Sequence, residues 1–163
     1  MSHKTKANQL IRIAVIGAGR CDEPTAAKAE AVGRAIAQAG AWLVCGGLGG
    51  VMAAASRGAR EAGGHTLGLL PSMERRDANR WIEVPVVTGL GHGRNVLVVS
   101  NADAVIAVGG EWGTLSEIAL ARKIGRPVVL LESWTLTNSH GHQVDLLTAE
   151  TPEEAVRLAL AAI

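Results

Sequence analysis

Two glycine-rich turns, each lying between an apolar strand-like run and a helix-like run, constrain this chain more than any other feature. The first turn spans residues 45–52 and the second spans residues 108–117. Glycine lets backbone N–H groups approach a ligand closely, and the N-terminus of a helix favours an anion. The two turns together therefore predict one site for a phosphorylated ligand.

The rest of the chain alternates strand-like and helix-like segments in the same way. Such alternation is typical of βαβ units with right-handed crossovers. We therefore predict an α/β fold, a single three-layer Rossmann-like, doubly wound domain over residues 1–163 with a mainly parallel sheet. Ligands bind such sheets beyond the carboxyl ends of the strands, where both glycine turns would lie. The predicted strands are 10–16, 42–45, 66–70, 82–87, 104–108 and 128–131, and the predicted helices are 24–39, 51–62, 94–101, 115–124 and 151–162.

Composition supports this fold and argues against several partners. The chain has no Phe, no Tyr and four Trp, so its core must consist of Val, Leu, Ile and Ala, as suits a parallel sheet. A net charge of +1 argues against a nucleic-acid partner. No apolar run approaches the roughly 18 residues of a membrane span, so no membrane partner is expected. Two cysteines provide no disulfide framework, and we expect a cytoplasmic protein whose residues 1–9 are flexible.

The turn after the first predicted strand begins like a dinucleotide fingerprint at Gly17 and Gly19 but does not complete it. Asp22 stands at the third glycine position, and the next strand leads into Gly46 instead of an acidic residue. NAD is therefore not expected. Gly17 and Gly19 remain candidate pocket residues.

The 45–52 turn holds Gly46, Gly47, Gly49 and Gly50 in close succession. Each glycine costs roughly 0.5–1 kcal/mol relative to Ala in ordered structure, so this concentration indicates a need for bare backbone. We favour an anion site, with Met52 beside it, over a simple tight turn that needs one or two glycines. The Lys-Ser/Thr pair of a P-loop does not follow.

The 108–117 turn has a competing structural interpretation. Thr114 and Glu117 are spaced as a capping box, in which the hydroxyl and the carboxylate each accept a hydrogen bond from a backbone N–H group. The box does not explain the large Trp112, for which a ring contact to the ligand is one role. It also leaves the glycines upstream of Thr114 unexplained.

Arg94 supports a site, because a cation in the first turn of a short helix opposes the helix dipole by roughly 0.3–1 kcal/mol. A bound anion would reverse that sign, whereas the alternative is an ion pair between Arg94 and Glu117 or another carboxylate. The two interpretations are compatible, because a bound anion can displace the ion pair. His92 is either a second donor to the anion or an ordinary loop histidine. His140 and His142 have no third ligand near them in the sequence, so no metal site is predicted.

Residues 46–52, 91–96, 102–107 and 109–117 occur in an order that resembles the SLOG superfamily. This Rossmann-like group contains the Lonely Guy phosphoribohydrolases, the molybdenum cofactor carrier proteins and DNA-processing proteins. The resemblance covers nearly the whole chain and is strongest to the carrier branch.

The chain departs from the hydrolase pattern at three positions. Where hydrolases have Pro-Gly-Gly-x-Gly-Thr-x-x-Glu, this chain has Gly109 at the proline and Glu111 at the second glycine. Asn95 replaces the lysine that follows the catalytic arginine of the hydrolases. Arg94 and Glu117 match the two residues that the hydrolases use in catalysis.

The resemblance implies a carrier-like protein that binds a phosphorylated small molecule and requires no cofactor of its own. The implied ligand is the molybdenum cofactor, another pterin or a nucleotide, and the implied assembly is a homo-oligomer, a dimer or tetramer. The alternative activity is that of a nucleoside 5′-monophosphate phosphoribohydrolase. The predicted ligand-binding residues are Gly17, Gly19, Gly46, Gly47, Gly49, Gly50, Met52, His92, Arg94, Asn95, Gly109, Gly110, Glu111, Trp112, Gly113, Thr114 and Glu117.

Overall fold

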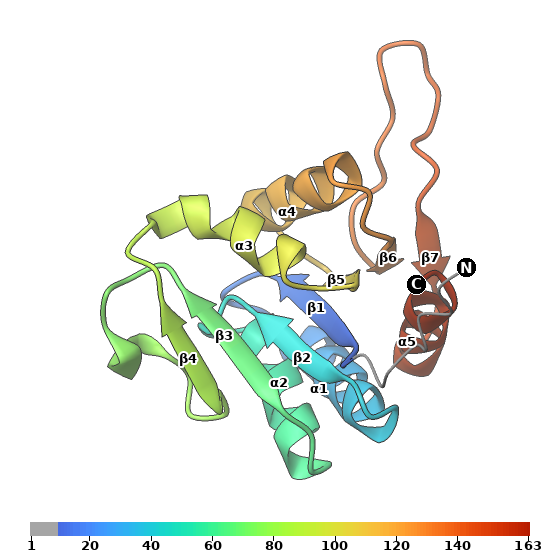
Figure 1. Ribbon diagram of the computed structural model, residues 1–163. Helices are drawn as coiled ribbons and strands as arrows, with labels where there is room; N and C mark the ends of the chain where they lie inside the picture. Colours follow the sequence, from blue (N-terminus) through green and yellow to red (C-terminus); the bar gives the residue numbers. More distant parts are fainter. Residues whose placement is uncertain (1–9) are drawn as a thin grey trace, which may run out of the picture.

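A seven-stranded sheet in the order β4-β3-β2-β1-β5-β6-β7 forms the centre of the structure, a computed structural model that describes residues 10–163 (Figure 1). Every strand pairing in this sheet is parallel, which confirms the predicted α/β Rossmann-like fold. The expected flexibility of residues 1–9 concerns residues outside the described part. The strands are β1 (Arg12–Gly17), β2 (Trp42–Cys45), β3 (Thr66–Leu70), β4 (Val84–Val87), β5 (Ala104–Val108), β6 (Val128–Leu131) and β7 (Leu147–Ala149).

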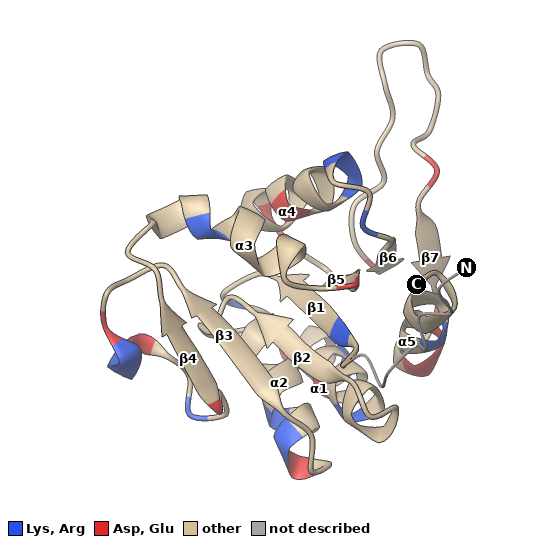
Figure 2. Cartoon of the chain, in the orientation of Figure 1, with Lys and Arg blue, Asp and Glu red and all other residues tan. Residues whose placement is uncertain are grey.

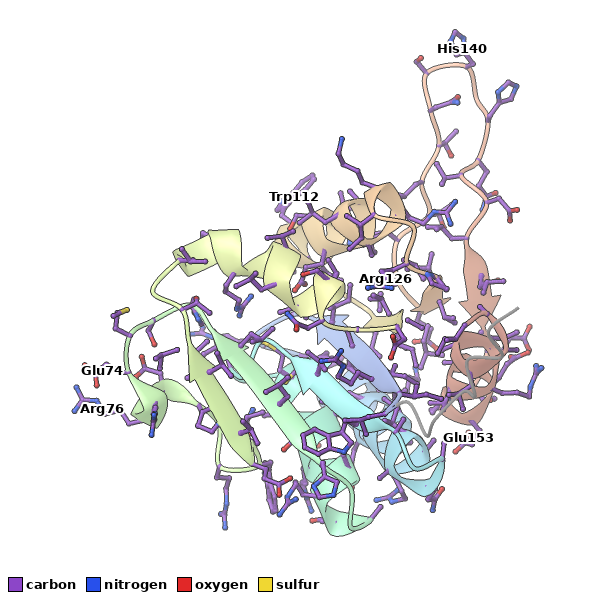
Figure 3. The ribbon with its side chains drawn as sticks, viewed as in Figure 1. Glu74, Arg76, Trp112, Arg126, His140 and Glu153 are labelled. Carbon is purple, nitrogen blue, oxygen red and sulfur yellow. The ribbon has the colours of Figure 1, made fainter. Side chains whose placement is uncertain are left out.

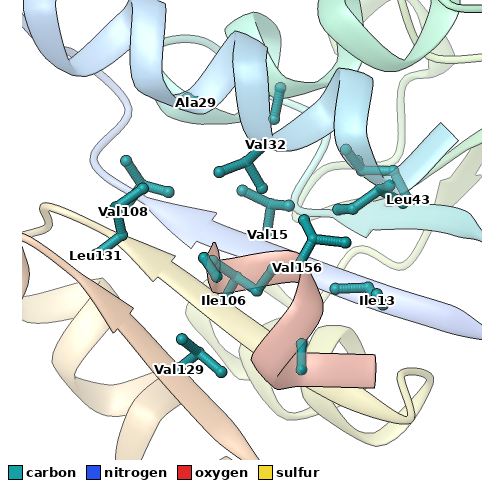
Figure 4. Close-up of a cluster of buried hydrophobic side chains, with 14 of the residues drawn as sticks. Ile13, Val15, Ala29, Val32, Leu43, Ile106, Val108, Val129, Leu131 and Val156 are labelled. Atoms are coloured by element: carbon teal, nitrogen blue, oxygen red, sulfur yellow. The ribbon is translucent and has the colours of Figure 1, made fainter. Parts of the chain in front are cut away.

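Helices cover both faces of the sheet and enclose two aliphatic core clusters. Helices α1 (Glu23–Gln38), α2 (Val51–Glu61) and α5 (Pro152–Ala161) enclose the first cluster, part of which is drawn in Figure 4. Helices α3 (Asn95–Ser100) and α4 (Trp112–Lys123) enclose the second cluster on the opposite face. The strands carry almost no charged side chains, and both signs of charge are spread over helices and loops (Figure 2). No helix in the described part of the chain is both long and apolar enough to span a membrane.

Two helices begin at caps that the sequence encodes locally. The Asp22 carboxylate accepts a hydrogen bond from the Thr25 N–H at 2.9 Å, ahead of α1. The Thr151 hydroxyl accepts one from the Glu154 N–H at 3.2 Å, ahead of α5. Each cap is followed by a proline in the first turn, where the missing N–H costs nothing.

Several boundaries differ from the predictions. Helix α4 begins at Trp112, three residues earlier than predicted, which changes the interpretation of the second glycine turn. The predicted helix 94–101 is a 3-10 turn, Gly91–Arg94, followed by the short α3. Strand β7 was not predicted, because three residues at the edge of a sheet give too little periodicity to recognise.

Residues 135–146 form an arm that projects from the body of the molecule (Figure 1). Its hydrogen bonds run between its own two sides, including Val144 N–H to the Leu136 carbonyl at 2.8 Å and Asn138 N–H to the His142 carbonyl at 2.9 Å. His140 lies at the tip, far from the sheet (Figure 3). The predicted loop 135–142 therefore covers the first side and the tip of a longer hairpin-like arm.

Candidate functional site

A cavity of about 420 Å³ lies at the carboxyl ends of the strands, between the segments that follow β1, β2, β3, β4 and β5. Strand β1 pairs with β2 on one side and with β5 on the other, so the chain progresses outward from β1 in both directions. Such a switch point leaves a crevice above the sheet, and the two glycine turns stand on either side of it. The cavity is lined by Val15, Ile16, Gly17, Ala18, Gly19, Gly46, Leu48, Met52, Pro71, Gly91, His92, Arg94, Asn95, Glu111, Gly113, Thr114 and Glu117.

Most of the predicted ligand-binding residues come together in this lining, although they span a hundred positions of sequence. The members of the lining that were predicted are Gly17, Gly19, Gly46, Met52, His92, Arg94, Asn95, Glu111, Gly113, Thr114 and Glu117. Sequence reasoning missed the apolar wall. The signal for Val15 and Ile16 was their place at the carboxyl end of a strand, the edge where ligands bind.

The remaining predicted glycines lie outside the lining and shape the turns instead. Gly47, Gly50, Gly109 and Gly110 all have positive φ, which favours glycine whatever the space around it. A Cβ at Gly50 would lie 2.3 Å from the Ala18 carbonyl oxygen, so the start of α2 packs directly on the loop after β1. Gly49 is likewise outside the lining.

Trp112 also lies outside the cavity. Its side chain is 77% exposed on the outer side of α4 (Figure 3). Its ring packs against Trp134, with centroids 5.5 Å apart. The tryptophan therefore belongs to the surface of the α3–α4 layer, and a direct ring contact inside the cavity is not available to it.

The first turn of α4 carries no capping box, which corrects the structural interpretation of the second glycine turn. The N-cap is Glu111, whose side chain makes no capping hydrogen bond. Thr114 and Glu117 lie within the helix, and the Thr114 hydroxyl is buried without a hydrogen-bond partner among the described residues. The first helical bond runs from the Leu115 N–H to the Glu111 carbonyl, so the N–H groups before Leu115 precede the ladder.

Arg94 is 8% exposed and is held by two acceptors of the protein. One terminal nitrogen donates to the Asn95 side-chain oxygen, and the other donates to the Gly46 carbonyl oxygen at 3.2 Å. A Cβ at Gly46 would lie 2.3 Å from this second nitrogen, so the glycine makes the contact possible. The Arg94 Nε has no partner in the described part of the chain. Burial lowers the pKa of Arg94, and the nearby Glu117 opposes that shift.

Glu117 is 7% exposed and faces the same cavity. Burial raises the pKa of its carboxyl from the ordinary 4.5 to about 7, against the opposing effect of the Arg94 charge. The salt bridges within residues 10–163 do not include the Arg94–Glu117 pair that the sequence left open. The cavity thus contains a desolvated guanidinium and a desolvated carboxyl that are close enough to interact but not paired.

A model of the SLOG cluster4 family matches residues 10–156, which is most of the chain. The chain belongs to the SLOG cluster4 family. This agrees with the resemblance carried by the two glycine turns and the segment around Arg94. An uncharacterised protein of Archaeoglobus fulgidus is 44% identical to this family member over 149 residues, covering 91% of this chain and 93% of that protein.

Two solved structures similar to this SLOG cluster4 protein are molybdenum cofactor proteins. The molybdenum cofactor binding protein of Rippkaea orientalis is 37% identical with a TM-score of 0.85, over 95% of this chain and 98% of that one. The molybdenum cofactor carrier protein of Chlamydomonas reinhardtii is 33% identical with a TM-score of 0.81, over 94% of this chain and 99% of that one. Nearly the whole fold is therefore shared with these proteins.

Proposed function

We propose that this protein binds a phosphorylated small molecule, the molybdenum cofactor or a related pterin or nucleotide, and acts as its carrier. The observation that carries the proposal is the uncapped start of α4 beside the unpartnered Thr114 hydroxyl, at the mouth of a cavity that also contains Arg94. A free helix N-terminus and a buried cation favour an anion there. The likeness to carrier proteins over nearly the full chain supports the same ligand class.

The size and the walls of the cavity are suited to such a ligand. A volume of about 420 Å³ lies within the usual range for small-molecule sites. Charge-assisted contacts of roughly 1.5–3 kcal/mol and a helix terminus of under about 1 kcal/mol reach only about millimolar affinity. Tighter binding requires apolar contact with a ring, for which Val15, Ile16, Leu48, Met52 and Pro71 provide the surface.

Replacing Thr114 by Ala tests the anion site. We expect Thr114→Ala to weaken binding of GMP by at least about tenfold in calorimetric titrations, because a hydrogen bond to a charged group contributes roughly 1.5–3 kcal/mol. Thr137→Ala in the projecting arm is the matched control and should bind as the unmodified protein does. Equal affinity in Thr114→Ala would contradict a phosphate at the start of α4. Native mass spectrometry of the purified protein would identify a co-purified ligand directly.

Hydrolysis of a nucleoside 5′-monophosphate is the alternative activity, and its two implied catalytic residues, Arg94 and Glu117, line the same cavity. The likeness to carrier proteins favours binding without turnover. Incubation with GMP and with AMP distinguishes the two activities. Release of guanine or adenine above the level of a Glu117→Ala control would establish the hydrolase, and the absence of both leaves the carrier.

We further propose that the protein forms a homo-oligomer through the α3–α4 layer. Val96, Trp112 and Leu120 line a groove between these two helices on the outside of the molecule. An apolar groove with a largely exposed tryptophan is typical of an interface rather than of a solvated surface. This surface adjoins the cavity, because His92, Asn95 and Gly113 line both.

A further inference from the structure

Two polar groups that line the cavity, the Glu117 carboxyl and the Nε–H of Arg94, are not accounted for by a phosphate at the start of α4. The Glu117 carboxyl is more than nine-tenths buried, faces the cavity and accepts no hydrogen bond among those of the described residues. An anion would be repelled by it. The Nε–H of Arg94 is likewise buried and unpartnered, while the other guanidinium nitrogens are bound to Asn95 and Gly46. The cavity therefore offers two acceptor oxygens and one spare donor.

The groups around Glu117 give it no internal partner. Arg94 from the segment before α3 is the nearest cation, and the thiol of Cys45 at the end of β2 is the other titratable group that interacts with it. Burial raises the pKa of Cys45, which keeps that thiol neutral near pH 7. Glu111 and His92 stand at the rim of the cavity. A ligand that satisfies Glu117 must therefore bring hydrogen-bond donors.

The apolar lining of the cavity limits which hydrogen-bond donors a ligand can present to Glu117. The apolar part of the lining consists of Val15, Ile16, Leu48, Met52 and Pro71. These side chains can pack on the faces of a flat ring, but they cannot form hydrogen bonds with the hydroxyl groups of a sugar. Two adjacent N–H donors on one ring edge, an amino group and a ring N–H, match a carboxylate in the bidentate geometry that makes such pairs strong. A methionine thioether also contacts aromatic rings favourably.

We propose that Glu117 and Arg94 together recognise one particular ring edge of the ligand. This inference rests on the proposed function. That edge carries an amino group, a neighbouring ring N–H and an oxo oxygen, as in the 2-amino-4-oxopyrimidine portion of pterins and guanine. Glu117 accepts hydrogen bonds from the two donors, and the spare N–H of Arg94 donates to the oxo oxygen. Adenine presents a ring acceptor where guanine presents a donor, so it does not match.

This arrangement couples recognition to the proton on Glu117. A carboxyl that titrates near pH 7 in the free protein must lose its proton to accept both donors, so ligand binding releases a proton. Affinity for the guanine edge therefore rises by about tenfold between pH 6 and pH 8, which is the change in the ionised fraction across that interval. A phosphate held at Glu117 would produce the opposite pH dependence.

Calorimetric titration with GMP, IMP, AMP and ribose 5-phosphate at pH 8 tests the assignment. We expect GMP to bind at least tenfold more tightly than IMP, which lacks the amino group, and than AMP. Glu117→Gln should lose this preference and the rise in affinity between pH 6 and pH 8, because an amide presents one acceptor and one donor. Glu153→Gln on the outer surface of α5 is the control and should retain both.

The outcomes separate this inference from the proposed function. Equal binding of GMP, IMP and AMP overturns the ring-edge assignment and leaves the phosphate site standing. Equal binding of ribose 5-phosphate and GMP overturns it as well, because the sugar would then hold Glu117. A GMP preference that survives in Glu117→Gln overturns the role of Glu117. Failure of all four compounds to bind the unmodified protein overturns the proposed function and this inference with it. A thermal melt of Glu117→Gln confirms that the variant is folded.

Discussion

At the scale of single residues, the spacing of Thr114 and Glu117 is interpreted differently once the first residue of α4 is known. Thr114 and Glu117 satisfy the capping-box pattern in sequence, but α4 begins at Trp112 and both residues lie on its inner side. Gly110 permits this early start, since a Cβ there would lie 2.5 Å from the Thr114 Cβ. The polar groups that a cap would have satisfied are therefore left for a ligand.

Glu117 should make the stability of the protein depend on pH. Its pKa is higher in the folded protein than in the unfolded chain, so the folded state holds the extra proton between about pH 4.5 and pH 7. Stability contributed by the neutral carboxyl is present below this interval and is lost as the pH rises through it. The loss is about 3 kcal/mol at roughly 1.4 kcal/mol per pH unit.

Denaturant unfolding at pH 5 and pH 8 measures this effect. We expect Glu117→Gln to lack the decline and to be more stable than the unmodified protein at pH 8, whereas Glu153→Gln should follow the unmodified protein. Hydrogen bonds, mainly from Thr25 and His65, lower the pKa values of Asp22 and Glu83 respectively. These two carboxyl groups therefore affect stability at lower pH than Glu117 does. Parallel curves for Glu117→Gln and the unmodified protein would contradict a buried carboxyl that ionises near pH 7.

At the scale of elements, α1 and α2 pack unusually closely because each presents a glycine to the backbone of the other. A Cβ at Gly33 would lie 1.8 Å from the Ala55 carbonyl oxygen, and one at Gly58 would lie 1.9 Å from the Glu30 carbonyl oxygen. The obstacle in both cases is backbone, which cannot rotate away. This contact positions the start of α2, and with it the first glycine turn, against the loop after β1.

Gly33→Ala should therefore destabilise the protein despite the better helix propensity of alanine. Overpacking costs typically 1–3 kcal/mol, which exceeds the roughly 1 kcal/mol gained from propensity. Gly113→Ala in α4 is the matched control, because a Cβ there meets nothing within 4 Å. Thermal or urea unfolding should give a lower stability for Gly33→Ala and an unchanged or slightly higher one for Gly113→Ala. If the stability of Gly33→Ala equals that of the unmodified protein, α1 and α2 can move apart at little cost in free energy.

At the scale of the whole molecule, the cavity and the exposed α3–α4 groove belong to one continuous surface. The sheet order puts the site above β1, and α3 and α4 cover the sheet beside it. The groove shares His92, Asn95 and Gly113 with the cavity, so assembly through the groove would close one side of the site.

Sedimentation of the purified protein tests this assembly. We expect a dimer or larger species, and we expect Val96→Glu to lower the measured mass because a charge in an apolar interface is costly. Met73→Glu, at an exposed loop position after β3, is the control and should leave the mass unchanged. A monomeric unmodified protein would contradict self-association, and an oligomer unaffected by Val96→Glu would place the interface elsewhere.

The amino-acid sequence by itself determined most of the elements, though not β7, and the edge of the sheet that bears the site. Aliphatic strands without Phe or Tyr, regular alternation with Ala-rich helices, and the caps at Asp22 and Thr151 are local properties, and local properties are legible in a single sequence. Only the tertiary structure decided which residues face the cavity. Arg94 reaches Gly46 across 48 positions, and this contact depends on how β1, β2 and β5 pair. A long-range contact of this kind follows from the closure of the whole sheet, which no local pattern specifies.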